Sequence, residues 1–203
     1  QQESQASVLT IVGKTHDFHA TEVLRVSLEE NLAMIRETVG YLHAAGRDII
    51  YDAEHFFDGW KANPDYARKT IQSAVEGGAM LVVMCYTNGG SLTEEITAIT
   101  KEALSVVDVP LGIHTHNDCD LSAANSLAAI DAGVIHVQGT INGLGERCGK
   151  AGMLAIMANL AIKKEGYELL NGSGIKHLTE LSRYVYEIAN LHFRSNQAFV
   201  GPS

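Results

Sequence analysis

Short apolar runs recur five times along the chain, each of a length suited to one β-strand. They cover residues 8–12, 48–51, 80–85, 110–113 and 134–137. The longer segments between them carry apolar residues three and four apart, as at Leu28, Leu32 and Ile35, which is the spacing of a buried helix face. Because strands joined through a helix run in the same direction, the pattern predicts an α/β fold with a parallel sheet.

Helix boundary signals agree with this alternation. Asn63 before a proline is a favourable helix start, and Ser91 with Glu94 has the spacing of a capping box. Several of the predicted helices end in a glycine one or two residues before the next apolar run. After the fifth strand, two further helices are predicted over residues 151–164 and 177–191.

Two architectures are built from such repeats, the open doubly wound sheet and the closed eight-stranded barrel. A dinucleotide-binding open sheet should carry Gly-x-Gly-x-x-Gly after its first strand, and the turn at Gly13 and Lys14 lacks it. Each predicted strand ends instead in a polar cluster, and in a barrel such clusters converge on one site. We therefore predict a partial barrel, since five units cannot close one that normally needs eight. Its unpaired edges, at residues 8–12 and 134–137, should favour association.

The sharpest polar cluster contains His114 and His116 at the end of the fourth predicted strand. Residues two apart in a strand point to the same face, so both imidazoles can bind one divalent metal ion. Asn117 and Asp118, which follow directly, are candidates for fixing the orientation of the rings. A pair of hydrogen-bonded histidines without a metal is the alternative, because two ligands are fewer than a metal site needs.

Three other strand ends carry candidate chemistry. In the glycine-rich segment 139–149, Glu146 could act as a base, or it could form a surface ion pair beside an ordinary Asn-Gly turn. Glu54 shares a face with Asp52 if the second strand continues through both, and it could contact a substrate or be solvated. Thr87 offers a hydroxyl to a carboxylate, or belongs to a glycine-rich turn.

Composition narrows the classes of function. The chain has 15 Lys and Arg against 24 Asp and Glu, and this net charge of −9 disfavours nucleic acid as a partner. Its three cysteines are widely spaced, which argues against a disulfide scaffold or a structural zinc site. No apolar stretch approaches the roughly 18 residues of a membrane helix, so we expect a soluble, cytoplasmic protein without a membrane partner.

Taken in order, these clusters resemble the catalytic barrel of the 2-isopropylmalate, homocitrate and citramalate synthases, members of the DRE-TIM metallolyase group. The segments 51–59 and 139–149 are most similar to the citramalate-synthase-like branch. The resemblance implies that the five strands are the fourth to eighth of a (β/α)₈ barrel, with the first three units upstream of Gln1. Residues 1–170 would form an incomplete catalytic domain of pyruvate carboxyltransferase type. Residues 171–203 would form a C-terminal helix leading into a further region.

The resemblance also implies a function. Such enzymes are acyltransferases of branched-chain amino-acid biosynthesis that condense acetyl-CoA with a 2-oxo acid bound to a divalent metal. We expect pyruvate, giving citramalate, first, and 2-oxoisovalerate, giving 2-isopropylmalate, second. We also expect a homo-oligomer, and we expect the 203 residues to be inactive by themselves. The resemblance does not distinguish Mg, Mn, Zn and Co as the bound metal. The family's site carries over to a catalytic Glu146, to Glu54, Thr87 and Asn142 as substrate-binding residues, and to His114 and His116 as metal ligands.

Two departures from the family pattern leave alternatives open. The chain has no Arg-Asp-Gly sequence, which supplies one ligand in the family, and Lys150 stands where the family has an asparagine ligand. A protonated lysine has no lone pair to donate to a cation. One alternative is therefore a degenerate, non-catalytic homologue that acts as a binding or assembly partner. Another is that the Lys150 ammonium replaces the metal and polarises the oxo-acid carbonyl.

Overall fold

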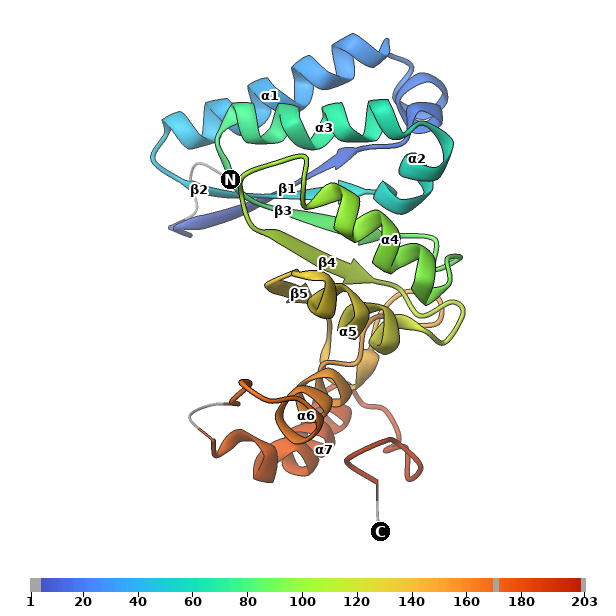
Figure 1. The fold of residues 1–203 in the computed structure, drawn as a ribbon. Coiled ribbons are helices and arrows are strands. Elements are labelled where there is room, and N and C mark those ends of the chain that lie inside the picture. Colours follow the sequence, from blue (N-terminus) through green and yellow to red (C-terminus); the bar gives the residue numbers. More distant parts are fainter. Residues whose placement is uncertain (1–4, 170–171, 202–203) are drawn as a thin grey trace.

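The structure, a computed structural model, describes residues 5–169 and 172–201. Five parallel strands form one sheet in the order in which they occur in the chain (Figure 1). They are β1 (Val8–Lys14), β2 (Asp48–Glu54), β3 (Ala79–Tyr86), β4 (Leu111–Thr115) and β5 (His136–Gln138). Each predicted apolar run overlaps one strand, so the predicted α/β fold with a parallel sheet is confirmed.

Helices connect the strands and cover one face of the sheet (Figure 1). They are α1 (Leu28–Ala44), α3 (Pro64–Gly77), α4 (Thr93–Ala103) and α5 (Ser122–Ala132). The main core lies between these helices and the strands, and Val39, Ile71 and Ile96 of the helices are fully buried in it. After β5 come α6 (Met153–Lys163) and α7 (Leu178–Ile188), as predicted. These two helices share a smaller apolar cluster that includes Leu154 and Leu178.

Short helical segments without a counterpart among the predicted elements include η1 (His19–Leu24), a π-helical turn, the 3₁₀ turn η2 (Ile141–Gly143), and α2 (Phe56–Ala62). The residue before α2 is His55, whose φ of 58° is left-handed and whose side chain makes no capping hydrogen bond. Burial of Phe56, Phe57 and Trp60 holds this helix in place instead, and a short helix stabilised by tertiary packing leaves no capping signal in the sequence.

The helix ends follow the expected chemistry with one exception. The Asn63 side chain accepts a hydrogen bond from the backbone N–H of Tyr66, at 3.1 Å. The capping box predicted at Ser91 is wrong, because α4 begins one residue later and the Glu95 carboxylate accepts from the Leu92 N–H, at 2.8 Å. The backbone N–H and C=O of Ser91 are instead both hydrogen-bonded to the buried hydroxyl of Tyr86.

The sheet is curved toward the face that the helices leave uncovered, which we call the inner face. On it, the Gln138 amide of β5 donates to the carboxylate of Asp52 in β2, at 3.0 Å. Three strand spacings of about 4.8 Å would separate these strands by about 14 Å in a flat sheet. Side chains of this length could not meet across that gap, so the strands must curl around the inner face.

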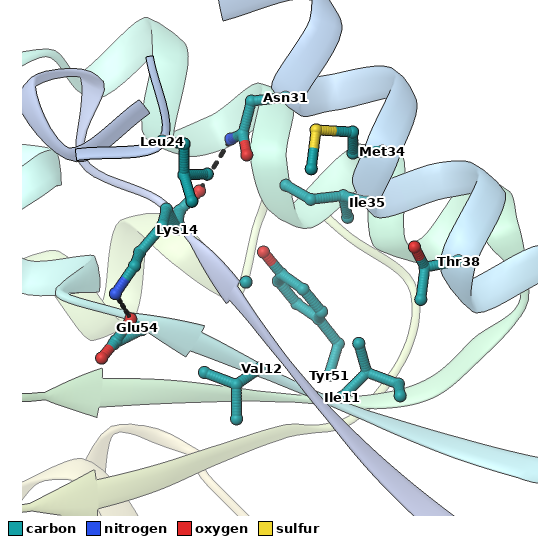
Figure 2. Close-up of a pocket in the computed structure, with 11 residues that line it drawn as sticks. Ile11, Val12, Lys14, Leu24, Asn31, Met34, Ile35, Thr38, Tyr51 and Glu54 are labelled. Carbon is teal, nitrogen blue, oxygen red and sulfur yellow. Dashed lines mark hydrogen bonds and ion pairs between the residues drawn. The ribbon is translucent and has the colours of Figure 1, made fainter. Parts of the chain in front are cut away.

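The two edges of the sheet are β1 and β5, as predicted, since among the described residues each pairs with one neighbouring strand. Val12 of β1 lies on the inner face with 61% of its surface exposed. On the other side of β1, a cavity of about 430 Å³ opens toward α1, and Figure 2 shows Tyr51 and Met34 at its wall. That these strands are the fourth to eighth of a barrel stays a prediction.

Two further expectations concern the domain boundary and membrane-spanning helices. The predicted domain boundary falls on residues 170–171, which lie outside the described residues. Within residues 5–169 and 172–201, no helix is both long enough and apolar enough to cross a membrane.

Candidate functional site

The candidate residues lie where the strands end, at one end of the sheet. Glu54 is the last residue of β2, Thr87 follows β3, and His114 lies near the end of β4. Glu146 and Lys150 belong to the segment after β5. Parallel strands have their carboxyl ends at the same edge, so the predicted convergence of the polar clusters follows from the sheet topology.

His114 and His116 form the centre of this end of the inner face. Their ring centroids are 5.3 Å apart and the ring planes are inclined by 32°. His116 is 5% exposed, and its Nδ1 atom is buried without a hydrogen-bond partner among the described residues. Burial, followed by the positive charge of Arg147, lowers the pKa of His116 to about 4. At neutral pH this imidazole is therefore uncharged and keeps one nitrogen lone pair.

The residues that contact these rings differ from those predicted. Both Asp118 oxygens accept from the Arg147 guanidinium, and the Asn117 amide oxygen accepts from Ser122. The prediction that Asn117 and Asp118 orient the rings is therefore wrong. The ring of His114 instead has its Nδ1 atom 2.8 Å from the amide oxygen of Gln138, its register partner on β5.

The two imidazoles fit a divalent cation as part of a ligand set. Each is a neutral nitrogen donor when unprotonated, and the buried Nδ1 of His116 has no competing partner in the described ranges. The described part of the chain nevertheless contains no group of three His, Cys, Asp or Glu side chains that could hold a metal ion. The pair thus supplies two ligands, and a complete site needs at least one more.

Lys150 lies beside this pair. Its backbone forms an antiparallel bridge with His116, and its N–H donates to the Gly143 carbonyl, at 3.0 Å. Burial raises the pKa of Asp52. The hydrogen bond from Gln138 opposes this shift, and so, to a smaller extent, does the nearby charge of Lys150. A cation bound between the histidines would therefore experience repulsion from an ammonium group on the same inner face.

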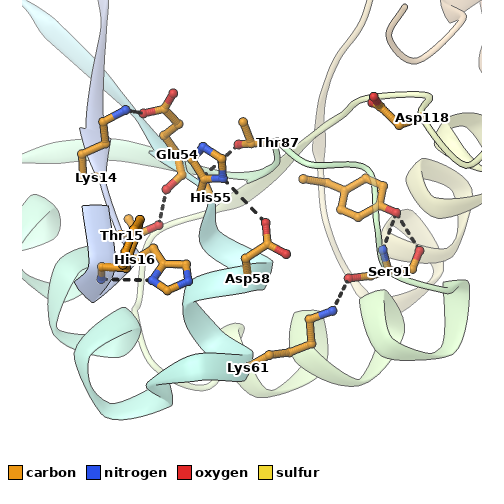
Figure 3. Close-up of polar contacts among 12 residues, drawn as sticks. Lys14, Thr15, His16, Glu54, His55, Asp58, Lys61, Thr87, Ser91 and Asp118 are labelled. Carbon is orange, nitrogen blue, oxygen red and sulfur yellow. Dashed lines mark hydrogen bonds and ion pairs between the residues drawn. The ribbon is translucent and has the colours of Figure 1, made fainter. Parts of the chain in front are cut away.

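Glu54 and Thr87 join the ends of the first three strands, as Figure 3 shows. The Glu54 carboxylate forms an ion pair with Lys14 of β1, and its backbone carbonyl accepts from the Thr15 hydroxyl, at 2.6 Å. The Thr87 hydroxyl accepts from the backbone N–H of His55, at 2.9 Å. Both candidates are therefore held in fixed positions at the end of the sheet where the carboxyl ends of the strands lie.

Arg147 connects three strand-end loops, a role that the sequence did not reveal. Its guanidinium donates to both Asp118 oxygens, at 2.8 and 3.0 Å, and to the Thr87 carbonyl, at 2.6 Å. The hydrogen bonds to Arg147 lower the pKa of Asp118. The same guanidinium pairs with Glu146 at 3.0 Å, and the Glu146 side chain is 68% exposed. The adjacent Glu-Arg pair was a signal, but the contacts with the other loops depend on the fold.

Asn142 is directed toward α7 rather than toward the histidines. Its amide donates to the Ser182 carbonyl, at 2.9 Å, and its oxygen accepts from the Ser182 hydroxyl, at 2.6 Å. Gln197 donates to the same oxygen, at 3.1 Å. The backbone of Asn142 is left-handed, with φ of 63°, a conformation that asparagine tolerates better than most residues. The structure thus gives Asn142 a structural contact, and its role in substrate binding stays a prediction.

Comparison with known proteins places this arrangement in a family. The family model described as HMGL-like matches residues 1–185. The chain belongs to the HMGL-like family. It is 49% identical to (R)-citramalate synthase of Geobacter sulfurreducens over 201 residues, which are 99% of this chain and 38% of that protein. It is 34% identical to homocitrate synthase AksA of Methanopyrus kandleri, covering 96% of this chain and 47% of the relative.

A solved structure agrees with this family assignment at the level of the fold. HMG-CoA lyase of Acinetobacter baumannii, in complex with coenzyme A and 3-methylmalate, has a TM-score of 0.74 and 20% identity, covering all of this chain and 68% of that one. The resemblance to the DRE-TIM group and its citramalate synthase branch is confirmed. The chain spans less than half the length of each of the two synthases named above.

Proposed function

We propose that this chain is part of an acyltransferase that condenses acetyl-CoA with pyruvate to give citramalate. The difference in identity carries the proposal, since 49% to a citramalate synthase exceeds 34% to a homocitrate synthase over a similar length. In the reaction, the acetyl methyl carbon loses a proton and bonds to the pyruvate carbonyl carbon, and water then hydrolyses the thioester to release coenzyme A. The product is a precursor in branched-chain amino-acid biosynthesis.

We further propose that β1 to β5 are strands four to eight of an eight-stranded barrel. The curl of the sheet toward its inner face supports this, because barrel closure requires such curvature. The exposure of Val12 supports it as well, since barrel interiors are filled by side chains from all strands. Residues 171–203 would then leave the barrel through α7.

Each candidate residue has a role in this proposal. His114 and His116 would contribute two ligands to a divalent cation, which when bound would polarise the carbonyl of the 2-oxo acid. The Thr87 hydroxyl would donate to the substrate carboxylate, and Glu54, released from Lys14, would bind or deprotonate substrate at the same strand ends. Glu146, exposed beside Arg147, would exchange protons with the solvent. The coenzyme A complex of the Acinetobacter enzyme supports acetyl-CoA as co-substrate.

A non-catalytic homologue that acts as a binding or assembly partner is the second candidate. Lys150 favours it, because it pairs with His116 through the backbone at the position where the family has an asparagine ligand, and its ammonium would weaken cation binding. The two candidates differ in what they require of the histidine pair. A catalytic protein must bind a cation there, or must use Lys150 in its place.

The test is product formation by the natural protein that contains this chain. We expect release of coenzyme A from acetyl-CoA with pyruvate, and citramalate detected by mass spectrometry, with a slower reaction on 2-oxoisovalerate. Glu54→Gln should abolish turnover, whereas Glu76→Gln, the same change on an exposed helix end, should not. Absence of product under conditions where the protein is folded would favour the non-catalytic homologue.

A titration with Mn²⁺ separates the possible roles of the cation site. His114→Ala and His116→Ala should each remove Mn²⁺ binding, and Lys150→Asn should tighten it on the order of tenfold by removing a repulsive charge. Lys101→Asn, an equivalent change on α4, should leave the affinity unchanged. Product formation that survives chelation but is lost in Lys150→Ala would instead identify the ammonium as the polarising group.

A further inference from the structure

The Gln138 side chain links Asp52 and His114 on the inner face. These two residues lie on β2 and β4, which are not neighbouring strands. The amide nitrogen of Gln138 is 3.0 Å from the Asp52 carboxylate on β2, and its amide oxygen is 2.8 Å from Nδ1 of His114 on β4. Both ends of the amide are therefore hydrogen-bonded, and the chain Asp52, Gln138 and His114 crosses the curved face of the sheet.

The chemistry of the three groups sets the direction of these hydrogen bonds. The amide NH₂ of Gln138 can only donate, and it donates to the Asp52 carboxyl group. The amide oxygen, which can only accept, faces His114. Nδ1 of His114 must consequently carry the proton, and in a neutral imidazole the other nitrogen, Nε2, keeps the lone pair.

We propose that Asp52 and Gln138 are positioning residues that hold His114 in the tautomer with the proton on Nδ1 and the lone pair on Nε2. A metal-binding histidine needs its unprotonated nitrogen directed to the cation, and a hydrogen bond at the other nitrogen secures this. The inference rests on the proposed function in so far as it takes His114 to be a metal ligand. It adds two residues that neither touch the cation nor lie near His114 in the sequence.

His116 provides an internal comparison. Its Nδ1 atom is buried and has no hydrogen-bond partner in residues 5–169 and 172–201, so these residues do not impose a tautomer on it through that nitrogen. The two rings are in contact, yet Gln138 bonds to one of them. A change at Asp52 or Gln138 should therefore affect the tautomer of His114 and leave that of His116 as it was.

The experiment reads the tautomers directly in the natural protein that contains this chain, without metal or substrate. In ¹⁵N-labelled protein at pH 8.5, where an ordinary imidazole is neutral, two-bond ¹H–¹⁵N spectra distinguish Nδ1–H from Nε2–H. We expect His114 to show the Nδ1–H form alone. In Asp52→Asn, the new amide can present either of its ends, so Gln138 can reverse and His114 should become a mixture of both forms.

Asp48→Asn is the matched control, because it makes the same substitution on the same strand at an exposed position. It should leave the spectrum of His114 unchanged. An Nε2–H form in the unmodified protein would overturn the proposal. A His114 spectrum in Asp52→Asn identical to that of Asp48→Asn would also overturn it.

Metal affinity gives a second measurement that does not need narrow resonances. In equilibrium dialysis with Mn²⁺ alone, we expect Asp52→Asn and Gln138→Met to bind about tenfold more weakly than Asp48→Asn. Equal affinities in all three variants would contradict the positioning role. If citramalate formation fails while the Nδ1–H form of His114 and its loss in Asp52→Asn are observed, the proposed function falls and the positioning role stands.

Discussion

The two faces of the sheet are built from alternate residues of the same strands, yet they differ in kind. On the outer face, Tyr51, Met84 and Ile113 are fully buried against the helices. On the inner face, Asp52 and His114 are polar and interact through Gln138. Because successive residues of a strand point to opposite sides, the chain can use one face for stability and leave the other for chemistry.

The energies of the two faces differ accordingly. Burying a side chain such as Ile113 contributes about 1.5–3 kcal/mol relative to leaving it exposed. A hydrogen bond such as that between Gln138 and Asp52 contributes only about 1 kcal/mol net, since both groups would otherwise bond to water. Substitutions in the core on the outer face should therefore lower the stability of the fold, and substitutions of the polar residues on the inner face should mainly alter ligand binding.

The largest effect is expected for Ile113→Ala in β4. Removing this fully buried side chain leaves a cavity between the sheet and the helices, and we expect a loss of about 3 kcal/mol in the free energy of unfolding, measured with urea. Ile135→Ala makes the same change at a residue that is 74% exposed, and should cost less than about 0.5 kcal/mol. Similar losses in both variants would show that the outer face is not the main source of stability.

A smaller loss is expected where the site meets α7. Asn142→Ala removes the hydrogen bonds with Ser182 and Gln197 and places an alanine at φ of 63°, so we expect a loss of about 2 kcal/mol. Asn142→Gly removes the same hydrogen bonds but tolerates the backbone conformation, and should lose about 1 kcal/mol less. Hydrogen exchange should quicken in α7 in both variants. If glycine is as harmful as alanine, the left-handed backbone carries no cost.

The smallest effect is expected on the inner face at the edge strand. Val12→Thr replaces an exposed residue of β1 by one of similar shape and strand propensity, so stability should change by less than about 0.5 kcal/mol in the same urea assay. A loss above 1 kcal/mol would indicate that Val12 is covered in solution, for example by a second copy of the chain. Size-exclusion chromatography at several protein concentrations would then show whether a second copy of the chain covers Val12.

Much of the site was predictable because it depends on local spacing. The adjacency of His114 and His116 follows from the two-residue period of a strand, and their position at an open end follows from the order of strands and helices. The helix α2 was not predictable in this way, since buried aromatic residues hold it and no cap marks its start. The bridging role of Arg147 was missed because its partners Asp118 and Thr87 belong to other loops.

By itself, the sequence determined the parallel α/β fold and the place of the histidine pair at the strand ends, since periodicity and spacing are local properties of the chain. Its motifs also carried the resemblance to the DRE-TIM synthases. The tertiary structure alone decided which groups act on that pair. Gln138 reaches Asp52, 86 residues away, only because the sheet curls. Curvature arises from the packing of all the strands and helices together, so no local pattern of residues records it.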